Sequence, residues 1–242
     1  MGMQLLGGIG MSDISVFGDS VLKGVIYENN SYKVSKSRFS NICEEILGVS
    51  IENKAKFGST ISTGKQIISK NIELIKETKS QYVVMEFGGN DCDFNWKEVS
   101  EDPDAEHFPK SKINEFVDIY SKLIYDLKTM GKEPVLLSLP PIDANKYFDH
   151  ITKKLNKENI LKWMRGNKQF LTNWHERYNI EVFKLAINNG VSIIDITSKF
   201  LEQKDYSKLL CDDGIHPTDE GHKIIADSIK EHIVNKKIKL VV

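Results

Sequence analysis

The sequence predicts an α/β protein in which a five-stranded parallel sheet lies between two layers of helices, a three-layer α/β/α sandwich. Short runs rich in β-branched and aromatic residues alternate with longer segments whose apolar residues recur every three or four positions. Strands that alternate with helices in this way pair in parallel, and the helices cover both faces of the sheet. No internal repeat or linker divides the 242 residues, so one domain over residues 1–242 is expected.

The first predicted strand is Ile14-Ser15-Val16-Phe17, and it runs directly into a Gly18-Asp19-Ser20 turn. A buried strand followed by a small, flexible turn is how an open α/β sheet usually begins. Four further strands are predicted from apolar runs that begin at Val49 and cover 82–87, 134–139 and 192–196.

Amphipathic segments predict five helices, over 37–47, 63–76, 113–130, 168–188 and from Thr218 onwards. The segment 113–130 has the most regular three-and-four spacing of apolar residues. Glycine, which readily ends a helix in a left-handed conformation, follows three of the segments closely, at Gly48, Gly131 and Gly190.

Three segments fit neither pattern. Residues 21–36 are polar and contain Asn29-Asn30, which predicts a surface loop. Residues 92–111 carry two prolines, and their apolar residues recur with no clear period. They are therefore expected to form an irregular insertion near the functional site. Residues 142–166 are expected to form a second insertion, helical only in part.

Composition excludes several classes of function. The formal net charge is −1, so no overall field attracts nucleic acid or an anionic membrane. No apolar run approaches the roughly 20 residues that span a bilayer. We therefore expect a protein that acts on a small molecule, without nucleic-acid or membrane-spanning partners.

The cysteines and the first residues indicate a compartment. Cys43, Cys92 and Cys211 are scattered and odd in number, which argues against a disulfide framework or a zinc site and fits a reducing environment. The leader 1–12 has no Lys or Arg before its apolar part, unlike a signal peptide, and Met11 is an alternative start. A cytoplasmic location without a bound metal is expected.

Polar residues follow the first three predicted strands and precede the last helix. Ser20, Gly58 and Asn90 come after strands, and an Asp213-x-x-His216 pair stands before the segment from Thr218. Acyl transfer needs a nucleophile, a base, a group that orients the base, and donors for the oxyanion. Taken alone, Ser20 is more typical of a helix cap and the Asp-His pair of a surface ion pair, and Asp212 competes for the orienting role.

Together these blocks resemble the SGNH/GDSL hydrolase superfamily, esterases and lipases named for a Ser, a Gly, an Asn and a His in separate sequence blocks. The matching segments, in family order, are Gly18-Asp19-Ser20, Gly58, Gly88-Gly89-Asn90-Asp91 and Asp213-Gly214-Ile215-His216-Pro217. The family's frequent Leu after the nucleophile is replaced here by Val21, a conservative change.

The resemblance implies a serine esterase or acylhydrolase that needs no cofactor. Ser20 would be the nucleophile, His216 the base, and Asp213 rather than Asp212 the residue that orients it. The oxyanion would be held by the N–H groups of Ser20 and Gly58 and by the Asn90 amide.

The substrate is less defined than the chemistry. Candidate substrate contacts, within the matching blocks or just after the third of them, are Asp19, Asp91, Asp93, Phe94 and Trp96. The mixture of aromatic and acidic residues favours a short acyl group on a polar, carbohydrate-like molecule. Lysophospholipase and thioesterase activities stay open. His107 and His150, in the two insertions, are expected to be exposed, and substrate contact stays open for either; His175 and His222 are expected to be structural or solvated.

Two other functions compete. Gly58 to Lys65 resembles a phosphate-binding loop, but five residues separate its glycines and Gln66 replaces the magnesium-binding Ser or Thr. A flavodoxin-like binding module could use the same sheet edge without catalysis, but it would not need a nucleophile, a base and oxyanion donors together.

Overall fold

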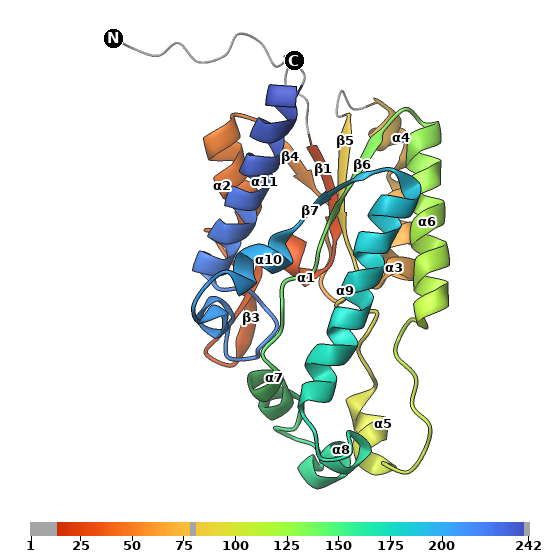
Figure 1. The fold of residues 1–242 in the computed structure, drawn as a ribbon, viewed down its shortest axis with the longest axis vertical. Helices are drawn as coiled ribbons and strands as arrows, with labels where there is room; N and C mark the ends of the chain where they lie inside the picture. The colour runs from red at the N-terminus through yellow and green to blue at the C-terminus, as the bar shows by residue number, and fades with distance from the viewer. Residues whose placement is uncertain (1–13, 78–80, 240–242) are drawn as a thin grey trace.

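The computed structural model describes residues 14–77 and 81–239, and five parallel strands form its central sheet (Figure 1). Their order is β4-β1-β5-β6-β7, and this confirms the predicted fold class. The strands are β1 Ile14–Gly18, β4 Ile51–Asn53, β5 Tyr82–Glu86, β6 Glu133–Leu137 and β7 Ser192–Ile194. The leader 1–12, with the alternative start at Met11, lies outside the described residues.

The chain leaves β1 towards β4 on one side and later returns to β5 on the other side. Ligands of open parallel sheets bind beyond the carboxyl ends of the strands at such a reversal of strand order. The Gly18-Asp19-Ser20 turn follows β1, and Asn90 follows β5 closely. The sheet topology therefore brings these two blocks to one crevice.

Two layers of helices cover the sheet, because successive side chains of each strand point to opposite faces. Phe17 of β1 and Met85 of β5 pack with one layer, whereas Val16 and Val84 pack with the other. The first layer holds α3 Ile61–Lys70, α4 Ile72–Glu77, α6 Ile113–Thr129 and α9 Gln169–Asn189; the second holds α2 Phe39–Leu47, α10 Ile196–Leu201 and α11 Asp219–Lys239 (Figure 1).

The surface loop predicted over 21–36 is wrong. The segment forms a short helix, α1 Ser20–Lys23, and an antiparallel hairpin of β2 Val25–Glu28 and β3 Ser31–Val34. Asn29 and Asn30 connect the two strands with φ of 52° and 58°, which is the left-handed pair that a tight hairpin turn requires. All four residues of β3 are exposed. The segment Ser31-Tyr32-Lys33-Val34 alternates polar and apolar residues over only four positions, so the signal for a strand is short.

The two insertions are also more regular than the sequence suggested. Residues 92–111 contain α5 Trp96–Glu101, and residues 142–166 contain α7 Ala144–Ile151 and α8 Lys157–Trp163. The three helices lie beyond the carboxyl ends of the strands (Figure 1). Their buried faces share an apolar cluster that includes Val99, Phe148 and Ile160. Helices of six to eight residues are too short to show a clear period, and here packing between distant segments stabilises them.

Other boundaries differ locally. The helix predicted over 63–76 is divided into α3 and α4 at Asn71, whose side-chain amide donates to the carbonyl of Ile67 at 2.7 Å. The last strand ends at Ile194 because Asp195 caps α10 by accepting the N–H of Ser198 at 2.9 Å. A short 3₁₀ helix, η1 Tyr206–Leu209, lies between α10 and the Asp213-x-x-His216 segment.

Helix α3 approaches the end of β5 so closely that Gly64 has no room for a side chain. A Cβ there would lie 2.3 Å from Cζ of Phe87, which is fully buried. We expect Gly64→Ala to lower the free energy of unfolding by about 1–3 kcal/mol, because helix and ring must move apart. Urea unfolding measures this change. Ser69→Ala, exposed on the same helix, is the control and should change stability by less than about 0.5 kcal/mol; equal stability of the two variants would contradict the close approach.

Candidate active site

Ser20 lies where β1 ends and α1 begins. Asp19 caps α1, because its Oδ1 accepts the N–H of Val21 at 2.8 Å. A Cβ at Gly18 would lie 2.9 Å from the carbonyl oxygen of Glu86, so only glycine lets the turn pack this closely on β5. The cap and the close packing hold the buried Ser20 at the wall of a cavity.

His216 joins Ser20 to Asp213. Its Nε2 lies 2.8 Å from Ser20 Oγ, and its Nδ1 lies 2.5 Å from Asp213 Oδ2. The other carboxylate oxygen of Asp213 accepts the backbone N–H groups of Ile215 and His216, at 3.2 and 3.1 Å. One tight turn thus orients the imidazole. Asp212 is exposed, so of the two neighbouring acids only Asp213 contacts the ring.

The ionised form of Asp213 is favoured although the residue is fully buried. Burial raises the pKa of its carboxyl, but the hydrogen bond and the charge of His216, with the backbone donors, outweigh burial and hold the pKa below its usual range. A carboxylate in this position can stabilise the imidazolium that forms when His216 takes a proton.

Three groups are candidates for holding an oxyanion. The backbone of Ser20 lies at the N-terminus of α1, and Gly58 lies after β4 with φ of +72° and open space beside it. The side chain of Asn90 lines the cavity with Ser20 and donates one amide hydrogen to Asp19 Oδ2 at 2.8 Å. The second amide hydrogen is left for another acceptor, since the group carries two.

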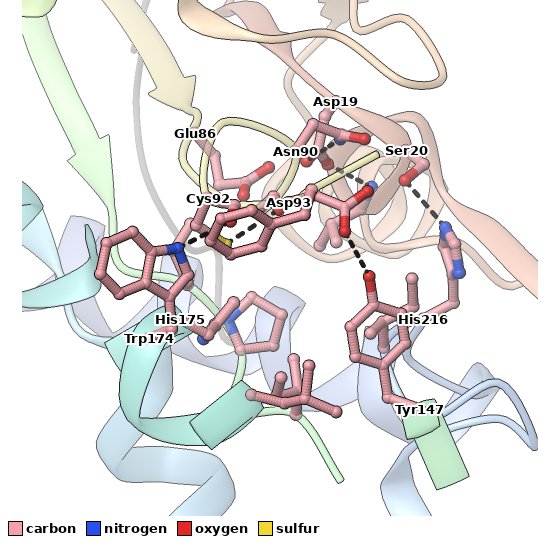
Figure 2. Close-up of a pocket in the computed structure, with 18 of the residues that line it drawn as sticks. Asp19, Ser20, Glu86, Asn90, Cys92, Asp93, Tyr147, Trp174, His175 and His216 are labelled. Carbon is pink, nitrogen blue, oxygen red and sulfur yellow. Dashed lines mark hydrogen bonds between the residues drawn. The ribbon is translucent and has the colours of Figure 1, made fainter. Parts of the chain in front are cut away.

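Asp19, next to Ser20 in the chain, and Glu86 form a pair of buried acids (Figure 2). Burial raises the pKa of both carboxyls, and the neighbouring Asp19 and Asp91 raise the pKa of Glu86 further. Asp19 accepts hydrogen bonds from Val21 and Asn90, which favour its charged form. The fold therefore favours the protonated form of Glu86 more strongly than that of Asp19.

A cavity of about 130 Å³ opens beside Ser20. Phe94, Trp96, Tyr147, Phe170 and Trp174 provide its aromatic wall, and they come from both insertions and from α9. The sequence marked Phe94 and Trp96 as substrate contacts, and both line this cavity.

Asp93 organises this wall. Its Oδ1 accepts hydrogen bonds from Trp96 Nε1 and from the Tyr147 hydroxyl, each at 2.7 Å (Figure 2). Its Oδ2 forms an ion pair with Lys110 at 2.8 Å. Asp93 lines the cavity as expected for a substrate contact, but its oxygens already hold the two insertions together.

Asp91, another expected substrate contact, does not line the cavity. It is fully buried and accepts the N–H of Ile61 at 2.9 Å and the Ser111 hydroxyl at 2.6 Å. Burial raises its pKa to about 6. The expected substrate contact is thus replaced by a structural one, because the side chain points to the start of α3 instead. Asp19 lines the cavity, yet its oxygens bind Val21 and Asn90.

Sequence reasoning missed the aromatic residues around His216. The Tyr32 ring on β3 lies 5.2 Å from the imidazole, and the Phe57 ring lies parallel to it at 6.0 Å. The Tyr32 hydroxyl also lies 2.9 Å from Nε2 of His150 on α7. The sequence signals for this hairpin were the Asn29-Asn30 turn and the short polar–apolar alternation from Ser31 to Val34.

His175 was also missed, since its place on an amphipathic helix suggested a structural or solvated role. It is only 6% exposed, and it lines the cavity. Burial lowers its pKa to about 4, so the ring is neutral at physiological pH. No feature of the sequence distinguishes it from other helical histidines.

Cys92 also lines the cavity, and its thiol donates to the carbonyl of Gly89 at 3.2 Å. Burial raises the pKa of this thiol well above its usual range, so it stays protonated and is a poor nucleophile.

Over residues 14–77 and 81–239 no helix is long and apolar enough to cross a membrane. The same residues contain no group of three or more His, Cys, Asp or Glu placed to hold a metal ion.

Comparison with known proteins agrees with this geometry. The model of the GDSL-like Lipase/Acylhydrolase family matches residues 16–224. The chain belongs to this family. A curated relative, the GDSL esterase/lipase CPRD49 of Arabidopsis thaliana, is 24% identical over 176 residues, which are 72% of this chain. The match spans 62% of that relative's length.

Solved structures with the same fold include a lipase/acylhydrolase and acetyl xylan esterases. A lipase/acylhydrolase from Enterococcus faecalis superposes with a TM-score of 0.67 at 17% identity, covering 93% of this chain and 97% of that one. An acetylxylan esterase, Axe2, from Geobacillus stearothermophilus gives 0.63 at 17% identity, covering 92% and 94%. The acetyl xylan esterase AlAXEase gives 0.62 at 17% identity, covering 91% and 99%. At these identities the likeness shows the fold.

The raised pKa of Glu86 should make stability depend on pH. Because its pKa is raised in the folded state, the folded protein binds more protons than the unfolded chain above the ordinary Glu value of 4.5, and stability falls as pH rises through the folded pKa. Glu86→Gln keeps the shape and cannot ionise. We expect this variant to gain stability over wild type between pH 5 and pH 8, measured by urea unfolding at both values.

Glu45→Gln on the exposed side of α2 is the matched control and should follow wild type at both pH values. Parallel losses of stability in wild type and Glu86→Gln would show that Glu86 is not the group that binds the proton.

Proposed function

We propose that this protein is a serine esterase that hydrolyses a carboxylic ester through an acyl-enzyme on Ser20. The observation that carries the proposal is the continuous chain of contacts from Ser20 Oγ through His216 to Asp213, at 2.8 and 2.5 Å, beside a cavity. A binding module would not need a serine hydroxyl aligned with a buried, oriented imidazole. Membership of the GDSL-like Lipase/Acylhydrolase family supports the same chemistry.

In the proposed mechanism Ser20 Oγ attacks the ester carbonyl carbon while His216 Nε2 takes the hydroxyl proton. Asp213 stabilises the imidazolium, and the carbonyl oxygen becomes an oxyanion held by the N–H groups of Ser20 and Gly58 and by the Asn90 amide. The intermediate then collapses: the carbon–oxygen bond to the alcohol breaks and His216 protonates the leaving oxygen. Water, activated by His216, attacks the acyl-enzyme in the same way and releases the acid.

We propose a short acyl group, such as acetyl, on a polar or carbohydrate-like alcohol. The size of the cavity supports this, because about 130 Å³ is well below the roughly 300–1,000 Å³ of typical drug-sized sites. Two similar structures are acetyl xylan esterases by name. A lysophospholipase or thioesterase would need space for a longer chain, and that alternative is tested below.

The remaining features support one catalytic domain in the cytoplasm. Both apolar layers pack on the same sheet, and both insertions border the same cavity. All three cysteines are free, buried thiols, as is usual in a reducing compartment.

The nucleophile and the acyl size can be tested together. We expect wild type to release nitrophenolate from p-nitrophenyl acetate faster than from the butyrate, with the octanoate slowest, because the cavity limits the acyl chain. Ser20→Ala should lose this activity and its labelling by a fluorophosphonate.

The possible contrary results are distinct. Rates that rise with chain length would favour the lysophospholipase or thioesterase alternative. Wild-type rates in Ser20→Ala would exclude Ser20 as the nucleophile. Absence of both turnover and labelling in wild type would favour the binding module.

The Asn90 amide can be tested separately. Removing one oxyanion donor typically slows turnover by about 100- to 1,000-fold, so Asn90→Ala should lower kcat by this factor on p-nitrophenyl acetate. The neighbouring Asn95 is exposed and makes no capping hydrogen bond, so Asn95→Ala should keep the wild-type kcat. An unchanged kcat in Asn90→Ala would remove Asn90 from the oxyanion hole.

A further inference from the structure

His175 of α9 is a buried polar residue that the proposed mechanism does not use. Neither ring nitrogen has a hydrogen-bond partner within the described chain. The fully buried side-chain atoms that lack a partner do not include these two nitrogens, so both are still accessible. The open direction is the cavity, which His175 lines. His222 shows the contrast, since both of its nitrogens are sealed away from solvent.

Its neighbour on the same helix face has a structural task. Asn179 lies one turn further along α9. Its side-chain amide oxygen, Oδ1, accepts the backbone N–H of Leu139 at 2.9 Å. Its amide donates to the Thr197 hydroxyl at 3.0 Å. Asn179 therefore connects α9 to the segment after β6 and to α10. His175 has no such role, and an apolar residue there would pack without leaving polar atoms unmatched.

The position of His175 is suited to meeting a substrate. Figure 2 shows Trp174 and His175 on the opposite side of the cavity from Ser20 and His216. The aromatic donors nearby are already in use: Trp174 Nε1 donates to the carbonyl of Cys92 at 2.8 Å, and Trp96 Nε1 donates to Asp93. These rings therefore present mainly carbon to the cavity, and His175 supplies an unused donor and acceptor.

A neutral imidazole carries one N–H donor and one bare nitrogen acceptor. A hydroxyl group can both donate and accept a hydrogen bond, so it can pair with either nitrogen of such a ring. An alkyl group displaces water from the ring but forms no hydrogen bond to replace those that are lost. A buried polar group that is left without a hydrogen bond weakens binding, and this loss of binding free energy is large enough to favour one substrate over another.

We propose that His175 determines specificity by hydrogen bonding a hydroxyl group of the substrate, so that the site prefers hydroxylated esters to alkyl esters of similar size. The inference rests on the proposed esterase function and deepens it. The hydroxyl can belong to the acyl part or to the alcohol part of the ester, and the two sources are separated by the choice of substrates.

Two substrate pairs test the proposal. The acyl pair is p-nitrophenyl 3-hydroxybutyrate against p-nitrophenyl butyrate, and the alcohol pair is glycerol 1-acetate against butyl acetate. Wild type should show a higher kcat/KM for the hydroxylated member of at least one pair. His175→Leu should reduce that preference by about 5- to 150-fold, the range expected when a buried polar group loses its match.

Two further variants distinguish hydrogen bonding from packing. His175→Gln retains a donor and an acceptor and should keep most of the preference. Asn173→Leu, exposed on the same helix, introduces the same side chain outside the cavity and should leave the preference at the wild-type value.

Each outcome is decisive. No hydroxyl preference in wild type, or an equal preference in wild type and His175→Leu, overturns the role of His175 while ester turnover upholds the esterase. A proportional loss on both members of a pair in His175→Leu assigns the residue to packing. If wild type turns over none of the four esters, the proposed esterase function is refuted, and the inference about His175 with it. If His175→Leu does not fold, His175→Met takes its place as the apolar variant, with the same expected loss of preference and the same contrary outcome.

Discussion

The contact between Ser20 Oγ and His216 Nε2 joins residues that are 196 positions apart in the chain. Its 2.8 Å distance requires the end of the first strand and the turn before the last helix to meet at one edge. The sheet meets this requirement because β1 is an inner strand, with β4 and β5 on either side. The proposed nucleophile is thus placed by the centre of the fold and the proposed base by the last connection.

A cluster of buried acids supports that contact from behind. Asp19 caps the helix that carries Ser20 and also accepts the Asn90 amide, so one carboxylate links the end of β1 to the loop after β5. Asp91 binds the start of α3, and Glu86, whose pKa both of these acids raise, lies at the end of β5. Burying several carboxyls costs free energy unless they share protons and hydrogen bonds. The hydrogen bonds of Asp19 and Asp91 offset part of this cost and fix the loop that carries Asn90, a proposed oxyanion donor.

Substrate selection lies in other parts of the chain. The aromatic wall comes from the two insertions and α9, and Asp93 fastens it by binding Trp96 and Tyr147 together. On the other side, the hairpin places Tyr32 against His216, and Tyr32 in turn contacts His150 of the second insertion. Segments outside the sheet therefore enclose a site whose chemistry the sheet connections provide. Such division lets loops vary the substrate while the scaffold keeps the reaction.

The sequence by itself determined the five-stranded parallel sheet and the blocks around Ser20, Asn90 and His216, because these depend on local patterns: apolar runs, helical spacing and short turns between them. Tertiary structure decided between Asp212 and Asp213, turned Asp91 towards α3, and brought His175 from a helix face to the cavity. It also formed the hairpin around Asn29-Asn30 and the three short insertion helices. These features depend on contacts between segments far apart in the chain, and such contacts leave no periodic signal in the sequence.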